Sequence, residues 1–150
     1  MTIDDVMDRL RKGGVRDDQF AGCDSTEVAW LEEAVGLPLP DSYKEFLLTF
    51  GRSAGKFGRD FHFFLFDSLR LVLADQYKIR RSINASLEDG GSGIYIVEEA
   101  FFFAGCSGNF WLFDLRDRRS NPPGYVASNE GDVVRVVAWS FTEFLVLDEG

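Results

Sequence analysis

The stretch LPLPDSYKEFLLTFG, residues 37–51, carries the strongest fold signal in this sequence. Its large apolar side chains recur at positions 43, 46, 47 and 50, which is the spacing of one face of an α-helix. Pro40 suits the first turn of that helix, and Asp41 lies near the positive end of its dipole. Gly51 is typical of a residue that follows a helix. The stretch therefore predicts a short helix from Pro40 to Gly51 with an aromatic face.

Further helices are predicted on both sides of this segment by periodic apolar residues and by capping pairs. Before it, Asp24 and Glu27 form an acidic capping pair for a helix that Gly36 ends. The other predicted helices are an N-terminal one capped by Thr2 and Asp5 and ended by Gly13, one over Leu69–Ile83 with a basic end, and one over Phe141–Leu147 with Ser140 and Glu143 as its capping box. The beginning of the Leu69–Ile83 segment is also compatible with a strand.

Short β-type runs follow one another in the second half of the chain, separated by Gly, Asn, Pro or Asp. The runs are Phe61–Phe66, Ile94–Val97, Phe101–Ala104, Phe110–Leu115, Tyr125–Ala127 and Val133–Trp139. Adjacent strands with short connections favour antiparallel pairing. We therefore expect one α+β domain over residues 1–150, with a mostly antiparallel central sheet of about five to six strands flanked by helices.

The composition is that of a folded domain with an aromatic core. The chain has 150 residues, 45% of them hydrophobic, and 15 are Phe, clustered at 57–66 and 101–113. Buried aromatic rings remove large areas from water, so they fill a core without disulfides or metal. The two cysteines, Cys23 and Cys106, are too far apart in sequence for a zinc motif and suggest a reducing compartment.

The charge is acidic and unevenly distributed. The net charge is −9; residues 1–87 carry 12 basic and 14 acidic groups, and residues 88–150 carry 4 and 11. Such a surface repels nucleic acid and anionic membranes and attracts a basic partner, although solubility alone also explains it. The charged N-terminus has no signal-peptide pattern, and no apolar run approaches about 18 residues. We expect a cytoplasmic protein.

The sequence offers little for catalysis. Gly105-Cys106-Ser107-Gly108 lacks the G-x-S-x-G spacing of a nucleophile elbow and the lysine of a phosphate-binding loop. A thiolate mechanism with Cys106 requires a base, and His62 is the single histidine. The carboxylates have no EF-hand spacing, and solvated acidic loops explain them. The sequence predicts a β-turn at the tip, no enzyme activity, no metal and no cofactor.

Four segments resemble the SMI1/KNR4 family of the SUKH superfamily. They are EEAVGLPLPDSYKEFL (residues 32–47), FAGCSGNFWLFDL (103–115), PPGYV (122–126) and AWSFTEFL (138–145), within a resemblance over residues 20–147. The matching structural positions are Gly36, Leu39, Pro40, Tyr43, Phe46, Leu47, Gly105, Gly108, Asp114, Phe141 and Phe144. Cys106 and Ser107 depart from the family, whose hairpin tip often has an acidic residue and consecutive glycines.

The resemblance implies an α+β fold and a protein-binding function. Most bacterial members are immunity proteins that bind and block a cognate toxin, many of which act on nucleic acid, whereas eukaryotic members are regulators. We expect an immunity protein for a basic toxin, monomeric or weakly dimeric; the alternatives are a regulatory or scaffold adaptor, or a small enzyme using Cys106 and His62. The residues expected to contact the partner are Glu98, Glu99, Trp111, Asp114, Asp117, Tyr125, Glu130 and Asp132.

Overall fold

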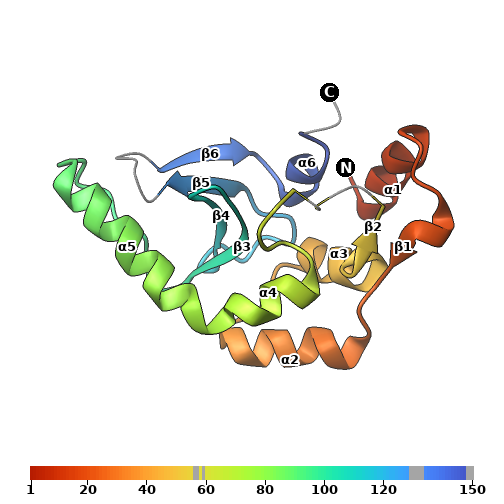
Figure 1. Ribbon diagram of the computed structural model, residues 1–150, viewed down its shortest axis with the longest axis horizontal. Helices are drawn as coiled ribbons and strands as arrows, with labels where there is room; N and C mark the ends of the chain where they lie inside the picture. Colours follow the sequence, from red (N-terminus) through yellow and green to blue (C-terminus); the bar gives the residue numbers. More distant parts are fainter. Residues whose placement is uncertain (56–57, 59, 129–133, 148–150) are drawn as a thin grey trace.

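The computed structural model describes residues 1–55, 58, 60–128 and 134–147 (Figure 1). Its main sheet contains β3 (Ala100–Cys106), β4 (Asn109–Asp114), β5 (Gly124–Ser128) and β6 (Val134–Ala138), paired antiparallel in that order. The α+β class and the antiparallel pairing are therefore confirmed. The predicted strand number is wrong for the described residues, because the main sheet has four strands and not five to six.

Two predicted strands lie beside the sheet without joining it. The segment over Ile94–Val97 is held by Asn84, whose side-chain amide bonds both the N–H and the carbonyl of Ile96. The backbone of Ile96 therefore pairs with a side chain and not with a neighbouring strand. The segment over Phe61–Phe66 meets the sheet at one isolated bridge, between Phe63 and Gly105. Hydrophobic patterning found both segments but not the partners of their backbone groups.

The first half of the chain is helical, as predicted. It contains α1 (Ile3–Lys12), α2 (Ser25–Val35) and α3 (Asp41–Phe50), with one 3₁₀ turn at Asp17–Gln19. Thr2 and Asp24 cap α1 and α2 through reciprocal capping boxes, and Gly36 ends α2 in the left-handed conformation. A two-stranded sheet of β1 (Phe20–Ala21) and β2 (Ser53–Ala54) was not predicted; strands of two residues leave too short a pattern.

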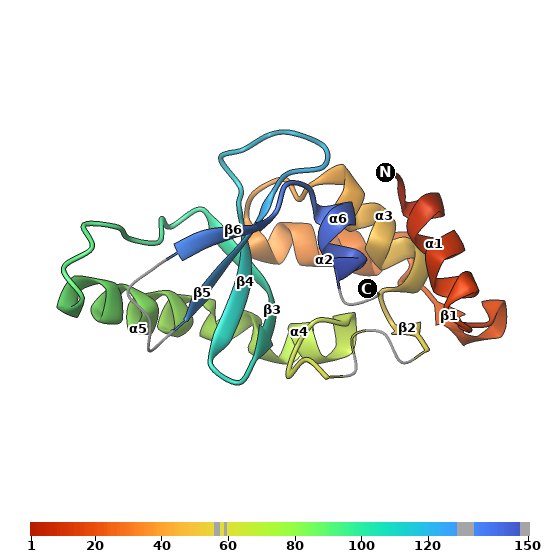
Figure 2. The ribbon, with the colours of Figure 1, turned by 90° about the horizontal axis from the view of Figure 1, so that it is seen from above.

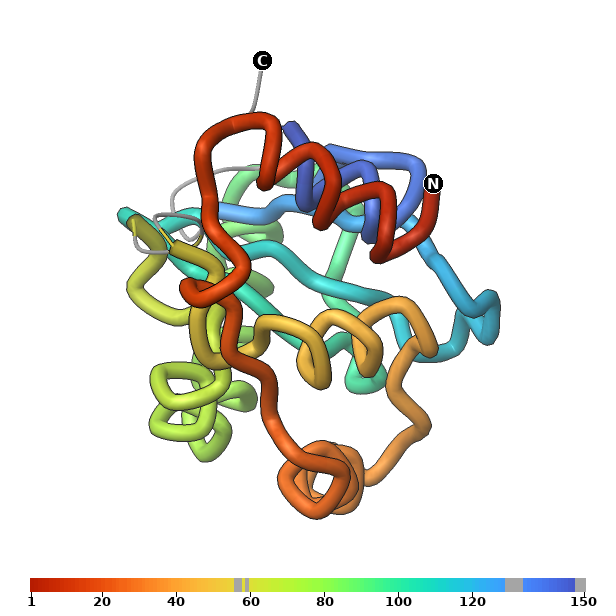
Figure 3. The backbone as a smooth tube through the Cα atoms, turned by 90° about the vertical axis from the view of Figure 1, so that its right-hand side faces the viewer, coloured from red at the N-terminus to blue at the C-terminus, as the bar shows by residue number. Residues whose placement is uncertain are grey.

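The helix predicted over Leu69–Ile83 is confirmed in its helical character but not as one continuous helix. The chain forms α4 (Phe66–Val72), a 3₁₀ turn (Leu73–Asp75) and α5 (Gln76–Asp89), which follow one another along the long axis of the molecule (Figures 1 and 2). The break places Gln76 beside β3, where its amide bonds the Phe102 backbone. The last helix, α6 (Phe141–Leu145), begins at the predicted cap Ser140 and packs near α1 and α3 (Figure 3).

An aromatic core joins the helices to the sheet. The side chain of Tyr43 on α3 is fully buried and lies edge-on to Phe113 and Phe141, with ring centroids 5.5 and 5.4 Å away. Phe103 stacks on Phe113 at 4.3 Å, and Phe46 on α3 lies in the same cluster. Burying a phenylalanine contributes about 1.5–3 kcal/mol, so these rings dominate the packing. The expectation of a phenylalanine core is confirmed.

The β3–β4 tip is a two-residue hairpin turn. Ser107 and Gly108 both have positive φ angles, 52° and 82°, as a type I′ turn requires. At Gly105 an added Cβ would lie 2.4 Å from Cε1 of Phe63, so only glycine allows this close approach. The family-like glycines at the tip therefore serve backbone geometry, and the predicted β-turn is confirmed.

Candidate protein-binding site

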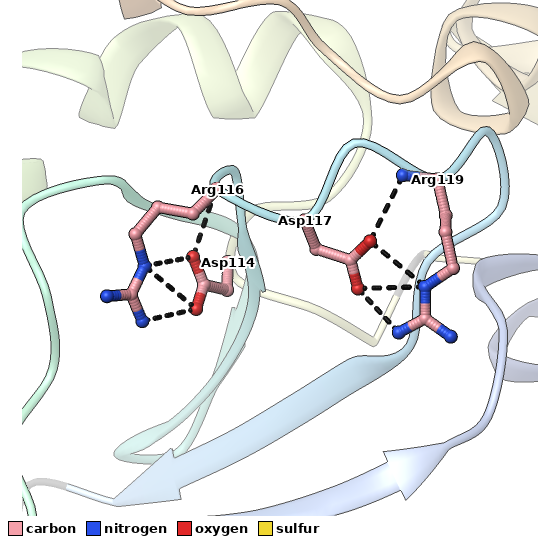
Figure 4. A network of polar contacts seen from close by, with 4 residues as sticks. All are labelled: Asp114, Arg116, Asp117 and Arg119. Atoms are coloured by element: carbon pink, nitrogen blue, oxygen red, sulfur yellow. Dashed lines mark hydrogen bonds and ion pairs between the residues drawn. The ribbon is translucent and has the colours of Figure 1, made fainter.

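The end of β4 and the loop that follows it contain two adjacent aspartate–arginine pairs (Figure 4). Arg116 holds Asp114 through its backbone N–H and through its guanidinium, with Nη2 2.8 Å from Oδ2. Arg119 holds Asp117 in the same way, with Nη2 2.6 Å from Oδ2. Each arginine follows its aspartate by two residues, so the sequence DLRDRR builds both pairs.

These pairs change the electrostatics that the sequence suggested. The hydrogen bonds from Arg116 hold the pKa of Asp114 below its usual value, and those from Arg119 lower the pKa of Asp117. Both carboxylates therefore stay ionised, but each charge is compensated by a guanidinium a few ångströms away. Asp114 and Asp117 contribute less to an acidic field than their number implies.

The same loop lies against the start of α3. A cleft of about 140 Å³ separates them, lined by residues that include Leu39, Lys44 and Arg118. The backbone N–H of Ser42 donates to the Ser120 carbonyl at 2.9 Å, which fixes the loop to the helix. Lys44 lies 3.4 Å from Glu32, whose carboxylate also accepts the N–H of Leu39 at 2.8 Å. The family-like segment thus positions the charged loop.

The two glutamates before β3 differ in their surroundings. Glu98 is exposed at a second cleft, of about 260 Å³, which α2, α5 and the start of β3 enclose. Its carboxylate is in no ion pair among the described residues. One carboxylate oxygen of Glu99, in contrast, is buried and has no hydrogen-bond partner in the described part of the chain. Glu98 is the one of the two whose carboxylate is open to a partner.

The two aromatic residues expected at the interface lie on opposite faces of the sheet. Trp111 is half-buried, with Phe61 edge-on at 5.2 Å and Phe144 at 6.3 Å. Tyr125 is half-buried and pairs across the strands with Leu112, the neighbour of Trp111. Because side chains alternate along a strand, one flat partner surface does not contact both. Glu130 and Asp132 lie outside the described residues.

Other exposed aromatics were missed by the sequence reasoning. The side chain of Trp139 is 77% exposed directly after β6, and that of Tyr95 is 70% exposed in the segment after α5. The sequence predicts Trp139 as the end of a strand, but β6 ends at Ala138 and Trp139 stands immediately before the capping residue Ser140. Trp139 follows the alternating strand pattern and precedes the helix cap. A large aromatic residue in that position could have been recognised from the sequence as exposed.

The cysteines are not arranged as nucleophiles. The Cys106 thiol donates to the Asp60 carbonyl, with Sγ 3.3 Å from the oxygen, and its other polar neighbour is Ser107 Oγ at 3.7 Å. His62 contributes its backbone N–H to Gly105 and no side-chain hydrogen bond among the described residues. Burial raises the pKa of Cys23 to about 11, so that thiol stays protonated. No hydrogen bond joins the His62 imidazole to the Cys106 thiol among the described residues, although the His62 backbone lies beside Gly105, the residue before Cys106.

The described residues offer neither a metal site nor a membrane-spanning helix. No group of three or more His, Cys, Asp or Glu side chains there is placed to hold a metal ion. None of the helices there has both the length and the apolar character that crossing a membrane requires.

Most of the chain matches the model of a known protein family. The model of the SMI1/KNR4 family (SUKH-1) matches residues 22–146, which include every helix and strand from α2 to α6. A search of curated proteins found no match. The family match confirms the resemblance that the sequence showed over residues 20–147.

Proposed function

Because the chain belongs to the SMI1/KNR4 family (SUKH-1), we propose that it is a non-catalytic protein-binding module of the immunity type. In this proposal it binds a cognate toxin in the cytoplasm and blocks the toxin's action by occupying its surface. The observation that carries the proposal is the family match over residues 22–146, which spans the whole sheet and the aromatic core. The eukaryotic regulators that share the resemblance make an adaptor the competing class.

The charge of the molecule supports a basic partner. A net charge of −9 attracts a cationic protein at long range and accelerates its association. The local arrangement limits which residues exert that attraction. Asp114 and Asp117 are each compensated by an arginine, whereas the Glu98 carboxylate is exposed beside an open cleft. We therefore assign Glu98 to partner attraction ahead of the two aspartates.

The surroundings of Trp111 and Tyr125 also decide which of these two aromatic residues is proposed to contact the partner. Trp111 packs against Phe61 and Phe144, so its ring already serves the core. Tyr125 lies on the opposite face of the sheet, in register with Val136 on β6. Hot spots of protein interfaces are enriched in tyrosine and tryptophan that become fully desolvated on binding. Tyr125 is the member of the expected pair that we propose as a partner contact.

A neutralisation experiment tests this function. The gene beside the one encoding this chain is expressed, its product is tested for toxicity, and the purified chain is titrated into the toxic protein. We expect a complex of one molecule each and loss of toxicity at stoichiometric amounts. A neighbour that is toxic but neither binds nor is neutralised would contradict the proposal, as would loss of toxicity at substoichiometric amounts, which indicates catalysis.

A further inference from the structure

The backbone groups at one edge of the main sheet are covered from within the chain. At β3 the Gln76 side chain donates to the Phe102 carbonyl at 2.8 Å and accepts the Phe102 N–H at 2.9 Å. Farther along the same edge, the Gly105 N–H donates to the Phe63 carbonyl at 2.9 Å, and the His62 N–H donates to the Gly105 carbonyl. These bonds occupy the positions that an added strand needs, so β3 is closed to a partner.

The opposite edge of the sheet, β6, is open in the described part of the chain. Four of its five residues pair with β5 on one side, Val137 being the extra residue of a bulge, and no described backbone or side chain bonds the outward N–H and carbonyl groups of the strand. Figure 1 shows β6 as the uppermost strand of the sheet. An unpaired edge is a template for another strand, and proteins that do not use such an edge commonly block it. Here β3 is covered by other segments of the chain, whereas β6 carries a bulge at Val137 and the charge of Arg135 but no covering segment among the described residues.

The side chains along β6 define what such a strand would meet. Its sequence is VRVVA; Val136 is 38% exposed and Arg135 is exposed. Arg135 is in no ion pair among the described residues, although residues 88–150 hold 4 basic and 11 acidic groups. Trp139 follows directly and is largely exposed. The edge therefore presents an apolar strand with one cation that is in no ion pair among the described residues, and an aromatic ring at its end.

We propose that β6 pairs with an extended strand of the partner protein, which adds to the sheet and carries an acidic side chain opposite Arg135. Main-chain hydrogen bonds would supply affinity, and the acid–arginine pair would supply register. A second copy of this chain fits less well, because its own β6 offers no acid and each copy carries a net charge of −9. The identity of the partner as a toxin rests on the proposed function; the open edge does not.

A peptide titration tests the edge without any toxin. The probe is a capped octapeptide in which valine and threonine flank one central glutamate, and its twin has lysine at that position. Each is titrated into the isotope-labelled full chain at low salt, and backbone amide shifts and hydrogen exchange are followed by NMR. We expect the glutamate peptide to protect amides of Val134–Ala138 and to bind about three-fold more tightly than its twin, the size of one cross-strand ion pair.

Charge reversal supplies the matched controls. Arg135→Glu should reverse the preference, so that the lysine peptide binds more tightly. Arg70→Glu makes the same change at an exposed arginine on α4 and should leave the preference as it was. Amide changes confined to other regions, equal affinities for the two peptides, or an unchanged preference in Arg135→Glu would overturn the proposal. Protection of β6 that rises with protein concentration, with no peptide present, would also overturn it by assigning the edge to a second copy.

The two proposals fail separately. If the peptides do not bind β6 but the toxin is neutralised, the contact lies elsewhere and the immunity function stands. If the peptides bind β6 with the expected preference but no toxin is neutralised, the strand-binding edge stands and the immunity function fails.

Discussion

At the scale of single residues, Tyr43 places a polar group in the centre of an apolar core. Its ring contacts Phe101, Phe103 and Phe113, yet its hydroxyl is buried without a hydrogen-bond partner among the described residues. Burial also raises the pKa of this phenol, so it stays neutral. An unsatisfied buried hydroxyl costs about 1–3 kcal/mol of folding free energy. The ring is therefore stabilising while its oxygen is not.

Replacing Tyr43 with phenylalanine should keep the ring and remove this cost. We expect Tyr43→Phe to raise the free energy of unfolding by about 1 kcal/mol, measured by urea denaturation. Tyr125→Phe is the matched control, because that side chain is half-buried and should change stability by less than about 0.5 kcal/mol. A loss of stability in Tyr43→Phe would show that the hydroxyl has a partner, such as an internal water.

The Asp114–Arg116 pair predicts a difference in acid stability. The pKa of Asp114 is lower in the folded chain than in the unfolded one, chiefly through its hydrogen bonds to Arg116. Its contribution to stability is therefore present above the unfolded pKa and is lost as pH falls below about 4. Arg116 is largely exposed, so the contribution is below about 1 kcal/mol. Between pH 7 and pH 3, the wild type should lose more unfolding free energy than Asp114→Asn; equal losses would contradict the assignment.

At the scale of elements, α5 acts as a cover for the edge of β3 through Gln76. Gln76→Ala leaves the N–H and the carbonyl of Phe102 unpaired in a buried strand, which should lower the free energy of unfolding by about 1–3 kcal/mol. Hydrogen exchange at the Phe102 amide should accelerate in the same variant. Lys78→Ala, an exposed position on α5, is the control and should change stability by less than about 0.5 kcal/mol. Unchanged exchange at Phe102 would remove this role from Gln76.

The elements that sequence reasoning placed well are those with local causes. Thr2, Asp24 and Ser140 cap helices where the capping patterns predicted, because a cap needs only residues three positions apart. The break between α4 and α5 was missed because its cause lies in the backbone of Phe102, 26 residues beyond Gln76. The prediction of a strand over Ile94–Val97 is wrong because of another contact that is distant in sequence. The side chain of Asn84 on α5 bonds the backbone N–H and carbonyl of Ile96.

At the scale of the whole molecule, the family and the α+β class were accessible from sequence, but the site was not. The signature around Pro40 marks packing positions such as Tyr43 and Phe46, and these lie in the core. The expected contact residues were chosen by charge and aromaticity, which do not tell an acid paired by a neighbouring arginine from a free one. Strand alternation then placed Trp111 and Tyr125 on opposite faces, because register comes from the assembled sheet.

The distinction between paired and free carboxylates predicts how the molecule attracts a basic partner. Glu98→Gln removes an exposed charge that is in no ion pair among the described residues, and it should lower the association rate constant with the toxin about two-fold at low salt. The double variant Asp114→Asn, Arg116→Gln removes a pair whose charges cancel, so its rate constant should equal that of the wild type.

Stopped-flow measurements of the association rate constants of both variants at low and high salt check these two expectations, because screening should abolish the Glu98 effect. Equal rate constants for wild type and Glu98→Gln at low salt would show that attraction comes from the rest of the surface, and a slower double variant would place the loop itself in the interface.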